Sequence, residues 1–218
     1  MKKKKILSRI GYGVLIGFIF IFSVMIVFNL THIYYNVLGP SMCPTLNYGV
    51  TSPNENKDGV FVSKVKSVRR GDIVVIDKQQ RDIEGNEEYI IKRLIALGGD
   101  KITVRLEGEY YRIVLIKNGE EEETIVEEPY LTDYSVNETT YNKFRNLIEE
   151  NDEFYLDTNG FLTIQEDEMF YLGDNRTNSY DCSNYGPVKS ETIVGRVDYI
   201  VYGNSFMYLQ VVKQFLGW

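Results

Sequence analysis

The sequence predicts a mainly β protein, in which an antiparallel β-sheet domain follows one amino-terminal transmembrane helix. Three observations support this fold class. An uncharged, mostly apolar run extends from Ile10 to Leu30. Short segments rich in β-branched and aromatic residues dominate the chain after it. Turn sequences such as Gly98-Gly99-Asp100 separate those segments.

The first element is the run from Ile10 to Leu30, which predicts a membrane-spanning helix. At about 1.5 Å per residue it reaches across a hydrocarbon core of about 30 Å. A cleaved secretory signal is the competing interpretation, because the basic residues Lys2 to Lys5 precede the run. Such a signal has an apolar stretch of only about 7–15 residues that ends at small residues, and the bulky segment 26–30 offers no such end. We therefore expect an uncleaved anchor.

Positive charges before the anchor predict the topology. Lys2 to Lys5 and Arg9 favour a cytoplasmic N-terminus, because Lys and Arg accumulate on that side of a membrane. The predicted division is a cytoplasmic basic tip at 1–9, a transmembrane anchor at 10–31 and an extracytoplasmic β-rich domain at 32–218. The chain is then a single-pass protein of the cell membrane.

The later elements follow from local composition. The interval at about 107–160 is more acidic and polar and includes a predicted short helix at 141–150, so we expect an inserted elaboration there. The carboxyl end, 206–218, is apolar in patches but too polar for a second span, which leaves association with the membrane surface. The predicted strands lie at 60–62, 72–76, 89–97, 101–106, 110–117, 161–164, 169–172 and 193–202.

Charge and cysteine usage narrow the class of protein. The formal net charge is -7, which argues against a nucleic-acid-binding surface. Cys43 and Cys182 are the two cysteines, too few for a disulfide scaffold and without the spacing of metal ligands. We interpret them as separate thiols, with a bridge between them as the alternative.

A candidate nucleophile and base stand out. Ser41 lies shortly before Pro44, just after the predicted anchor, and Lys92 lies in a predicted strand. His32 is the only histidine, so a Ser-His-Asp triad would depend on that one residue, and a lysine becomes the natural base. Apolar neighbours such as Ile90 favour a lowered lysine pKa, although only alternate residues of a strand share a face.

Four ordered motifs point to a family. SMCPTL at 41–46, RRGDIVVI at 69–76, YIIKRLIALGGDKI at 89–102 and GDNRTNSYDCSNYGPV at 173–188 follow the predicted anchor. Together they resemble the motifs of bacterial type I signal peptidases, and the single anchor is similar to the Gram-positive form. The resemblance implies a serine endopeptidase that removes signal peptides from exported preproteins and needs no metal or cofactor.

The resemblance also assigns roles to residues. It implies that Ser41 is the nucleophile and Lys92 the general base, and that most of their supporting residues lie in the last motif. Ser179 matches a residue that hydrogen-bonds the lysine amine, and Gly173 matches a position where a side chain would crowd that lysine.

One position departs from the common pattern of the family, and another, shared with relatives of the Gram-positive type, leaves the oxyanion donor open. Asp181 matches an acid that many relatives pair with an arginine two residues later, where this chain has Ser183. Gly39 stands where some relatives place a serine that donates to the oxyanion, so the second donor is left open. Asp174 is expected to pair with Arg93 and fix the strand that carries Lys92.

The implied partners are preprotein signal peptides and the lipid bilayer. The substrate is expected to bind in an extended form along a strand edge, with small residues before the cut. Three alternative functions compete with this one: a catalytically silent assembly chaperone, a membrane-tethered binding module and a soluble self-cleaving repressor-type protease. The presence of Ser41 and Lys92 counts against the first, the four motifs against the second and the membrane span against the third.

Overall fold

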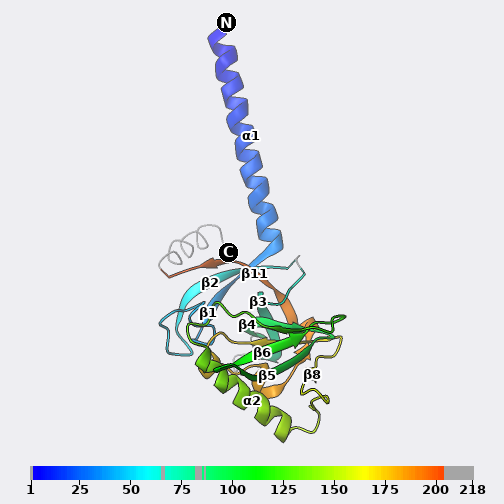
Figure 1. Cartoon of the computed structure of the whole chain (residues 1–218). Coiled ribbons are helices and arrows are strands. Elements are labelled where there is room, and N and C mark those ends of the chain that lie inside the picture. Colours follow the sequence, from blue (N-terminus) through cyan, green and yellow to red (C-terminus); the bar gives the residue numbers. More distant parts are fainter. Residues whose placement is uncertain (1, 65–66, 82–84, 86, 204–218) are drawn as a thin grey trace.

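The computed structural model describes residues 2–64, 67–81, 85 and 87–203. Its larger sheet has seven strands in the order β1-β2-β11-β3-β4-β9-β10, and every pair in it is antiparallel (Figure 1). The mainly antiparallel fold class is therefore confirmed. The strands are β1 (His32–Leu38), β2 (Asn56–Ser63), β3 (Ile73–Arg81), β4 (Glu87–Leu97), β9 (Glu168–Leu172), β10 (Val188–Lys189) and β11 (Ile193–Val201).

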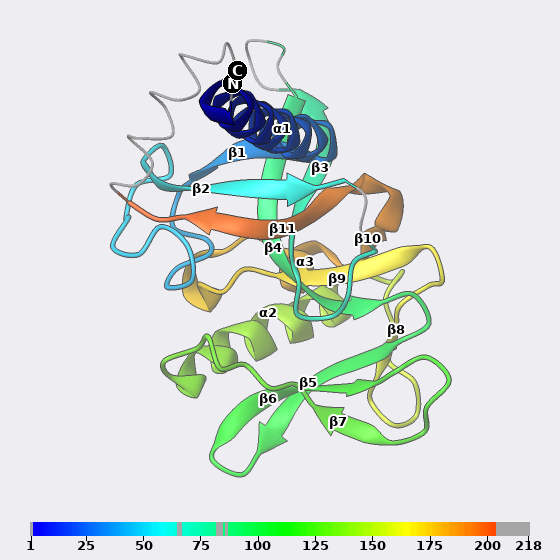
Figure 2. The same ribbon diagram turned by 90° about the horizontal axis from the view of Figure 1, so that it is seen from above.

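A second sheet and a helix stand beside the larger sheet. The second sheet has the order β7-β6-β5-β8, and α2 (Asn137–Glu150) lies between it and the larger sheet (Figure 2). Its strands are β5 (Lys101–Glu107), β6 (Tyr110–Ile116), β7 (Glu123–Ile125) and β8 (Leu162–Thr163). The short helices are η1 (Tyr134–Val136), η2 (Arg176–Asn178), α3 (Cys182–Tyr185) and η3 (Ser190–Thr192). The predicted elaboration at 107–160 lies within this region, and its boundaries stay a prediction.

The central strands are buried on both faces, which explains their nearly continuous apolar sequences. Val74 and Ile76 of β3 belong to a core cluster with Phe144 of α2, whereas Val75 belongs to a cluster with Val37 of β1. Alternate residues of a strand point to opposite faces, so a run of Ile and Val serves both clusters. Lys92 faces the first cluster, because it lies opposite Val74 in the β3–β4 register.

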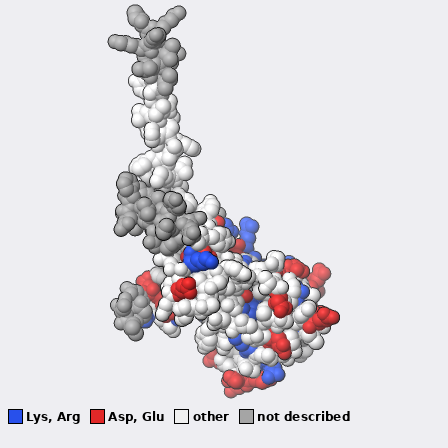
Figure 3. Space-filling view, turned by 90° about the vertical axis from the view of Figure 1, so that its left-hand side faces the viewer, with Lys and Arg blue, Asp and Glu red and all other residues white. Residues whose placement is uncertain are grey.

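The helix α1 (Lys2–Thr31) projects from the β domain. Its segment Gly11–Thr31 has a mean hydropathy of 2.6 and is long and apolar enough to cross a membrane. In Figure 3 the charged side chains gather on the β domain, and the Gly11–Thr31 part of α1 is free of them. Strand β1 starts at His32, directly after the last residue of α1.

The structure differs from the sequence prediction at several elements. α2 begins at Asn137 rather than 141, and β1, β7 and β10 were not predicted. β7 and β10 have three and two residues, too few for a period of two to be recognised. β1 was missed because its apolar sequence continues directly from that of the anchor. The prediction for 206–218 lies outside the described residues.

Candidate active site

Ser41 lies in the loop between β1 and β2, and a second loop holds it in place. Gly39 has φ +72°, a left-handed conformation that glycine adopts without strain, so the chain can turn sharply before Ser41. The backbone N–H of Asn175 donates to the Ser41 carbonyl oxygen at 3.0 Å. The Asn175 side chain donates to the Pro40 carbonyl at 3.1 Å. The loop after β9 therefore fixes the backbone of Ser41.

Lys92 meets Ser41 from strand β4. Its Nζ donates a hydrogen bond to Ser41 Oγ over 2.8 Å, and the residue is only 4% exposed. Burial lowers the pKa of the Lys92 amine to about 8, while the nearby carboxylates of Asp181 and Asp174 limit the shift. Lysine is ordinarily charged until about pH 10. Near neutral pH this amine can therefore change its protonation state while in contact with a hydroxyl.

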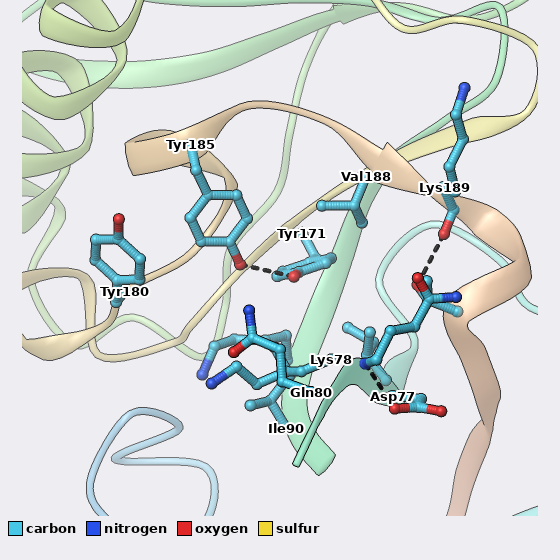
Figure 4. A pocket seen from close by; sticks show the side chains of 13 residues that line it. Asp77, Lys78, Gln80, Ile90, Tyr171, Tyr180, Tyr185, Val188 and Lys189 are labelled. Atoms are coloured by element: carbon cyan, nitrogen blue, oxygen red, sulfur yellow. Dashed lines mark hydrogen bonds between the residues drawn. The ribbon is translucent and has the colours of Figure 1, made fainter. Parts of the chain in front are cut away.

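A pocket of about 670 Å³ opens beside Lys92 (Figure 4). The hydroxyl oxygens of Tyr171 and Tyr185 on its wall lie 2.6 Å apart, and apolar side chains such as Ile90 and Val188 complete the wall. The pocket gives a ligand room next to the buried amine.

Gly173 and Ser179 lie next to this pair of residues. A Cβ built on Gly173 would collide with the Ser179 side chain and with the Ser41 carbonyl oxygen, so a glycine is required for this close approach. Ser179 Oγ is buried, but it forms no hydrogen bond within the described residues. The bond to the lysine amine that the resemblance implies is thus missing here. Lys92 Nζ is instead directed at Ser41 Oγ.

The comparison with protein families decides the family. A model of the family described as "Signal peptidase, peptidase S26" matches residues 9–202.

The chain belongs to this signal peptidase family.

Two relatives at 32% identity agree with this assignment. A signal peptidase I of Bacillus caldolyticus is 32% identical over 169 residues, which cover 76% of each chain. One of Streptococcus pneumoniae is 32% identical over 183 residues, covering 75% of this chain and 78% of the relative. A solved signal peptidase I from Enterococcus faecalis is 22% identical and covers 61% of this chain and 97% of its own, with a TM-score of 0.36. The family model and the two relatives at 32% identity confirm the resemblance to type I signal peptidases and the assignment as a peptidase.

Arg93 and Asp174 form the ion pair that was expected of this signal peptidase. Arg93 donates from Nε and Nη2 to the two Asp174 oxygens at 2.8 and 2.7 Å. Thr45, in the same loop as Ser41, donates to Asp174 at 2.5 Å. The Arg93 guanidinium also stacks over the Tyr130 ring, 3.9 Å from its centroid. Asp174 therefore joins the Ser41 loop to strand β4.

Asp181 has a local role that does not need an arginine. Its carboxylate accepts from the Ser183 hydroxyl at 2.7 Å, from the Ser183 N–H at 3.2 Å and from the Gly173 N–H at 2.9 Å. Asp181 thus caps α3 and anchors Gly173. Ser183 thus provides a partner for Asp181 at the position where the resemblance led us to look for an arginine.

The backbone around Ser41 restricts the donors for an oxyanion. The Gly39 N–H already donates to the Glu55 carbonyl at 3.0 Å, and Pro40 has no N–H. The Ser41 N–H forms no hydrogen bond within the described residues. Of these three positions, only Ser41 has a free donor.

The remaining candidates form no hydrogen bond with the side chains of Ser41 and Lys92 within the described residues. His32 contacts Asp198 on β11 at 3.3 Å and stacks on Phe28 at the end of α1. Cys43 and Cys182 are both free thiols, in agreement with the favoured interpretation. Histidine is therefore not a partner of Ser41 in this structure.

The sequence interpretation missed the polar residues that support the site from a distance. Glu128 and Arg176 form a buried ion pair, and Lys143 donates to two carbonyls of the loop after β9. The only available signal was the position of Arg176 inside the last motif. Its partners lie in the 107–160 interval, whose polar composition is equally typical of solvated loops.

Proposed function

We propose that this chain is a membrane-bound serine endopeptidase that cleaves signal peptides from preproteins, with Ser41 as nucleophile and Lys92 as general base. One observation carries the proposal: Lys92 Nζ lies 2.8 Å from Ser41 Oγ and has a pKa lowered to about 8 by burial. A serine hydroxyl is a weak nucleophile until a base takes its proton. A neutral lysine amine in contact with that hydroxyl meets this need.

The first half of the reaction forms an acyl-enzyme. Neutral Lys92 takes the Ser41 proton while Ser41 Oγ attacks the carbonyl carbon of the scissile bond. The Ser41 N–H stabilises the oxyanion of the tetrahedral intermediate as one donor. The resulting Lys92 ammonium then gives its proton to the leaving amine, and the C–N bond breaks.

The second half releases the signal peptide. Lys92, neutral again, takes a proton from a water molecule that attacks the ester of Ser41. The tetrahedral intermediate collapses, Ser41 regains its proton from Lys92, and the free carboxylate leaves. Ser179, Gly173, Asp181, Asp174 and Arg93 support this cycle by shaping the surroundings of the lysine.

Strand β4 offers an edge for an extended substrate. On one side β4 pairs with β3, and on the other side it pairs with β9 only over Arg93–Leu97. Among the described residues, its 87–92 half therefore has no partner strand on the β9 side. An extended peptide can add to such an edge through backbone hydrogen bonds. The edge ends at Lys92, which would bring the scissile bond to the Ser41–Lys92 dyad.

The helix α1 supports membrane attachment. We propose a cytoplasmic tip at 1–9, a membrane span at 10–31 and an outer catalytic domain from 32 onward in the cell membrane. The apolar Gly11–Thr31 segment favours insertion, and the basic residues before it favour this orientation.

The test is cleavage of a preprotein with an Ala-x-Ala site by the full-length protein in detergent. Ser41→Ala and Lys92→Ala should each lower the rate by at least about 10³-fold, since removing a nucleophile or its base removes the covalent route. Ser190→Ala and Lys117→Ala are matched controls at half-buried positions that form no hydrogen bond with Ser41 or Lys92, and they should keep full activity. A Lys92→Ala variant with undiminished cleavage would refute lysine as the base.

A further inference from the structure

The loop at residues 173–179, between β9 and α3, borders the dyad at two points. Its Asn175 N–H donates to the Ser41 carbonyl at 3.0 Å. Its Gly173 has no room for a Cβ against the Ser41 carbonyl and Ser179 Oγ. A shift of this loop would therefore move Ser41 or the surroundings of Lys92. The groups that hold the loop consequently influence the geometry of the dyad.

Lys143 on α2 reaches the end of this loop. Its Nζ donates to the backbone carbonyls of Ser179 and Arg176 at 2.6 and 3.1 Å. These carbonyls lie at the start of η2 and just beyond its end. Carbonyls at the end of a helical turn lack partners within the helix, and an ammonium gives them charge-assisted hydrogen bonds. Lys143 thus fixes the backbone on which the Ser179 side chain is carried.

A buried ion pair holds the other end of the loop. The Arg176 and Glu128 side chains are 1% and 0% exposed and are joined by a hydrogen bond. Arg176 Nε donates to the Gly173 carbonyl at 3.1 Å. Asn137 accepts from Arg176 at 2.6 Å and donates to Glu128 at 2.8 Å. Glu128 and Asn137 thus orient the arginine that holds Gly173.

All three holding groups, Glu128, Asn137 and Lys143, come from one stretch of the chain between β7 and β8. We propose that Lys143 is a positioning residue for the Ser41–Lys92 dyad, acting through the 173–179 loop with the help of the Glu128–Arg176 pair. Through these three side chains, the segment that carries α2 then supports the geometry of the dyad. This inference rests on the proposed function of the dyad.

Lys143 is suited to a test because its role in the fold is limited. It forms no ion pair within the described residues, and its hydrogen bonds end on the loop. Two positions further on, Arg145 is exposed, and its one ion pair within the described part of the chain is with Glu149 at 3.4 Å. Arg145→Met therefore removes the same charge from the same helix without touching the loop.

The experiment compares the full-length wild type with Lys143→Met, Lys143→Arg and Arg145→Met on the same preprotein. Methionine keeps most of the lysine stem but cannot donate. Lys143→Met should lower kcat by about tenfold or more, the scale of a lost charge-assisted hydrogen bond, with KM within about twofold. The acid limb of the pH–rate profile of Lys143→Met should move to higher pH. A loosened loop admits water, which relieves the desolvation that lowers the Lys92 pKa. Lys143→Arg should retain most activity.

The outcomes separate the two proposals. If the wild type is active and Lys143→Met matches Arg145→Met in kcat and pH profile, the positioning role is overturned and the dyad stands. If Lys143→Met only lowers thermal stability while kcat and the profile stay unchanged, the positioning role is likewise overturned. A folded wild type that cuts no preprotein would overturn the proposed function and the positioning role with it.

Discussion

At the scale of single residues, Lys92 combines contact with a hydroxyl and a lowered pKa. Both arise from its position on the face of β4 that packs on the core cluster of Val74 and Phe144. There the Lys92 amine is buried and directed at Ser41 Oγ. The neighbouring Arg93 points to the opposite face and keeps its charge in the ion pair with Asp174. Because side chains alternate between the two faces of a strand, the two adjacent basic residues have opposite pKa shifts: the pKa of Lys92 is lowered and that of Arg93 is raised.

The pKa of Lys92 predicts the pH dependence of the reaction. The neutral amine is the active form, so activity should be lost as pH falls below the pKa of about 8 and should level off above it. Well below that value, kcat/KM should drop about tenfold for each pH unit. A pH series with the wild-type enzyme measures this limb. A flat profile between pH 6 and 9 would contradict the assignment of Lys92 as the base.

At the scale of elements, α2 and the segment before it are joined to the loop after β9 by polar contacts. The Glu128–Arg176 pair is the deepest of these, since both side chains are almost completely buried. A buried charge that loses its partner cannot recover the hydration that it gave up on folding. The pair therefore makes this junction sensitive to single substitutions.

Breaking this pair should destabilise the protein strongly. Glu128→Gln leaves Arg176 buried beside a neutral group, so the free energy of unfolding should fall by about 3 kcal/mol. Glu127→Gln changes the neighbouring, largely exposed glutamate and should stay close to the wild type. Chemical denaturation in detergent measures both variants.

A double substitution supplies the second check on this pair. Replacing both members, as in Glu128→Leu with Arg176→Met, should recover most of the lost stability, because no unpaired charge remains. Equal stability of Glu128→Gln and the wild type would show that the pair does not support the fold.

At the scale of the whole molecule, the anchor and the sheet are directly joined. α1 ends at Thr31 and β1 begins at His32. Phe28 stacks on His32 and also contacts the rings of Phe61 and Tyr199. The junction has no linker, so the β domain stays next to the end of the proposed membrane span.

Removal of the anchor should separate membrane attachment from chemistry. Deleting residues 2–31 should lower cleavage of a vesicle-inserted preprotein by about 10²-fold. Without α1 the enzyme is no longer held on the same membrane as the substrate, so their effective concentration falls. Cleavage of the same preprotein in detergent should fall much less. A control with residues 11–27 replaced by leucines should behave as the wild type. Equal losses in vesicles and detergent would mean that α1 is needed for folding.

The sequence by itself determined the composition of the elements and the identity of the candidate residues. The apolar run, the main strands of both sheets and the family motifs follow from local patterns, which depend on neighbouring residues only. Ser41 and Lys92 were found in this way. Local patterns also explain the failures: β7 and β10 are too short to show a period, and β1 follows the anchor without a break.

Only the tertiary structure decided which of these residues meet. The burial of Lys92, its contact with Ser41 and the missing Ser179 hydrogen bond depend on how β4, the Ser41 loop and the 173–179 loop are packed. The partners of Arg176 were equally hidden, because Glu128 lies 48 positions away in a polar segment that resembles a solvated loop. A lysine pKa and a buried ion pair depend on the loss of water around a charge, and that loss is produced by segments distant in the sequence.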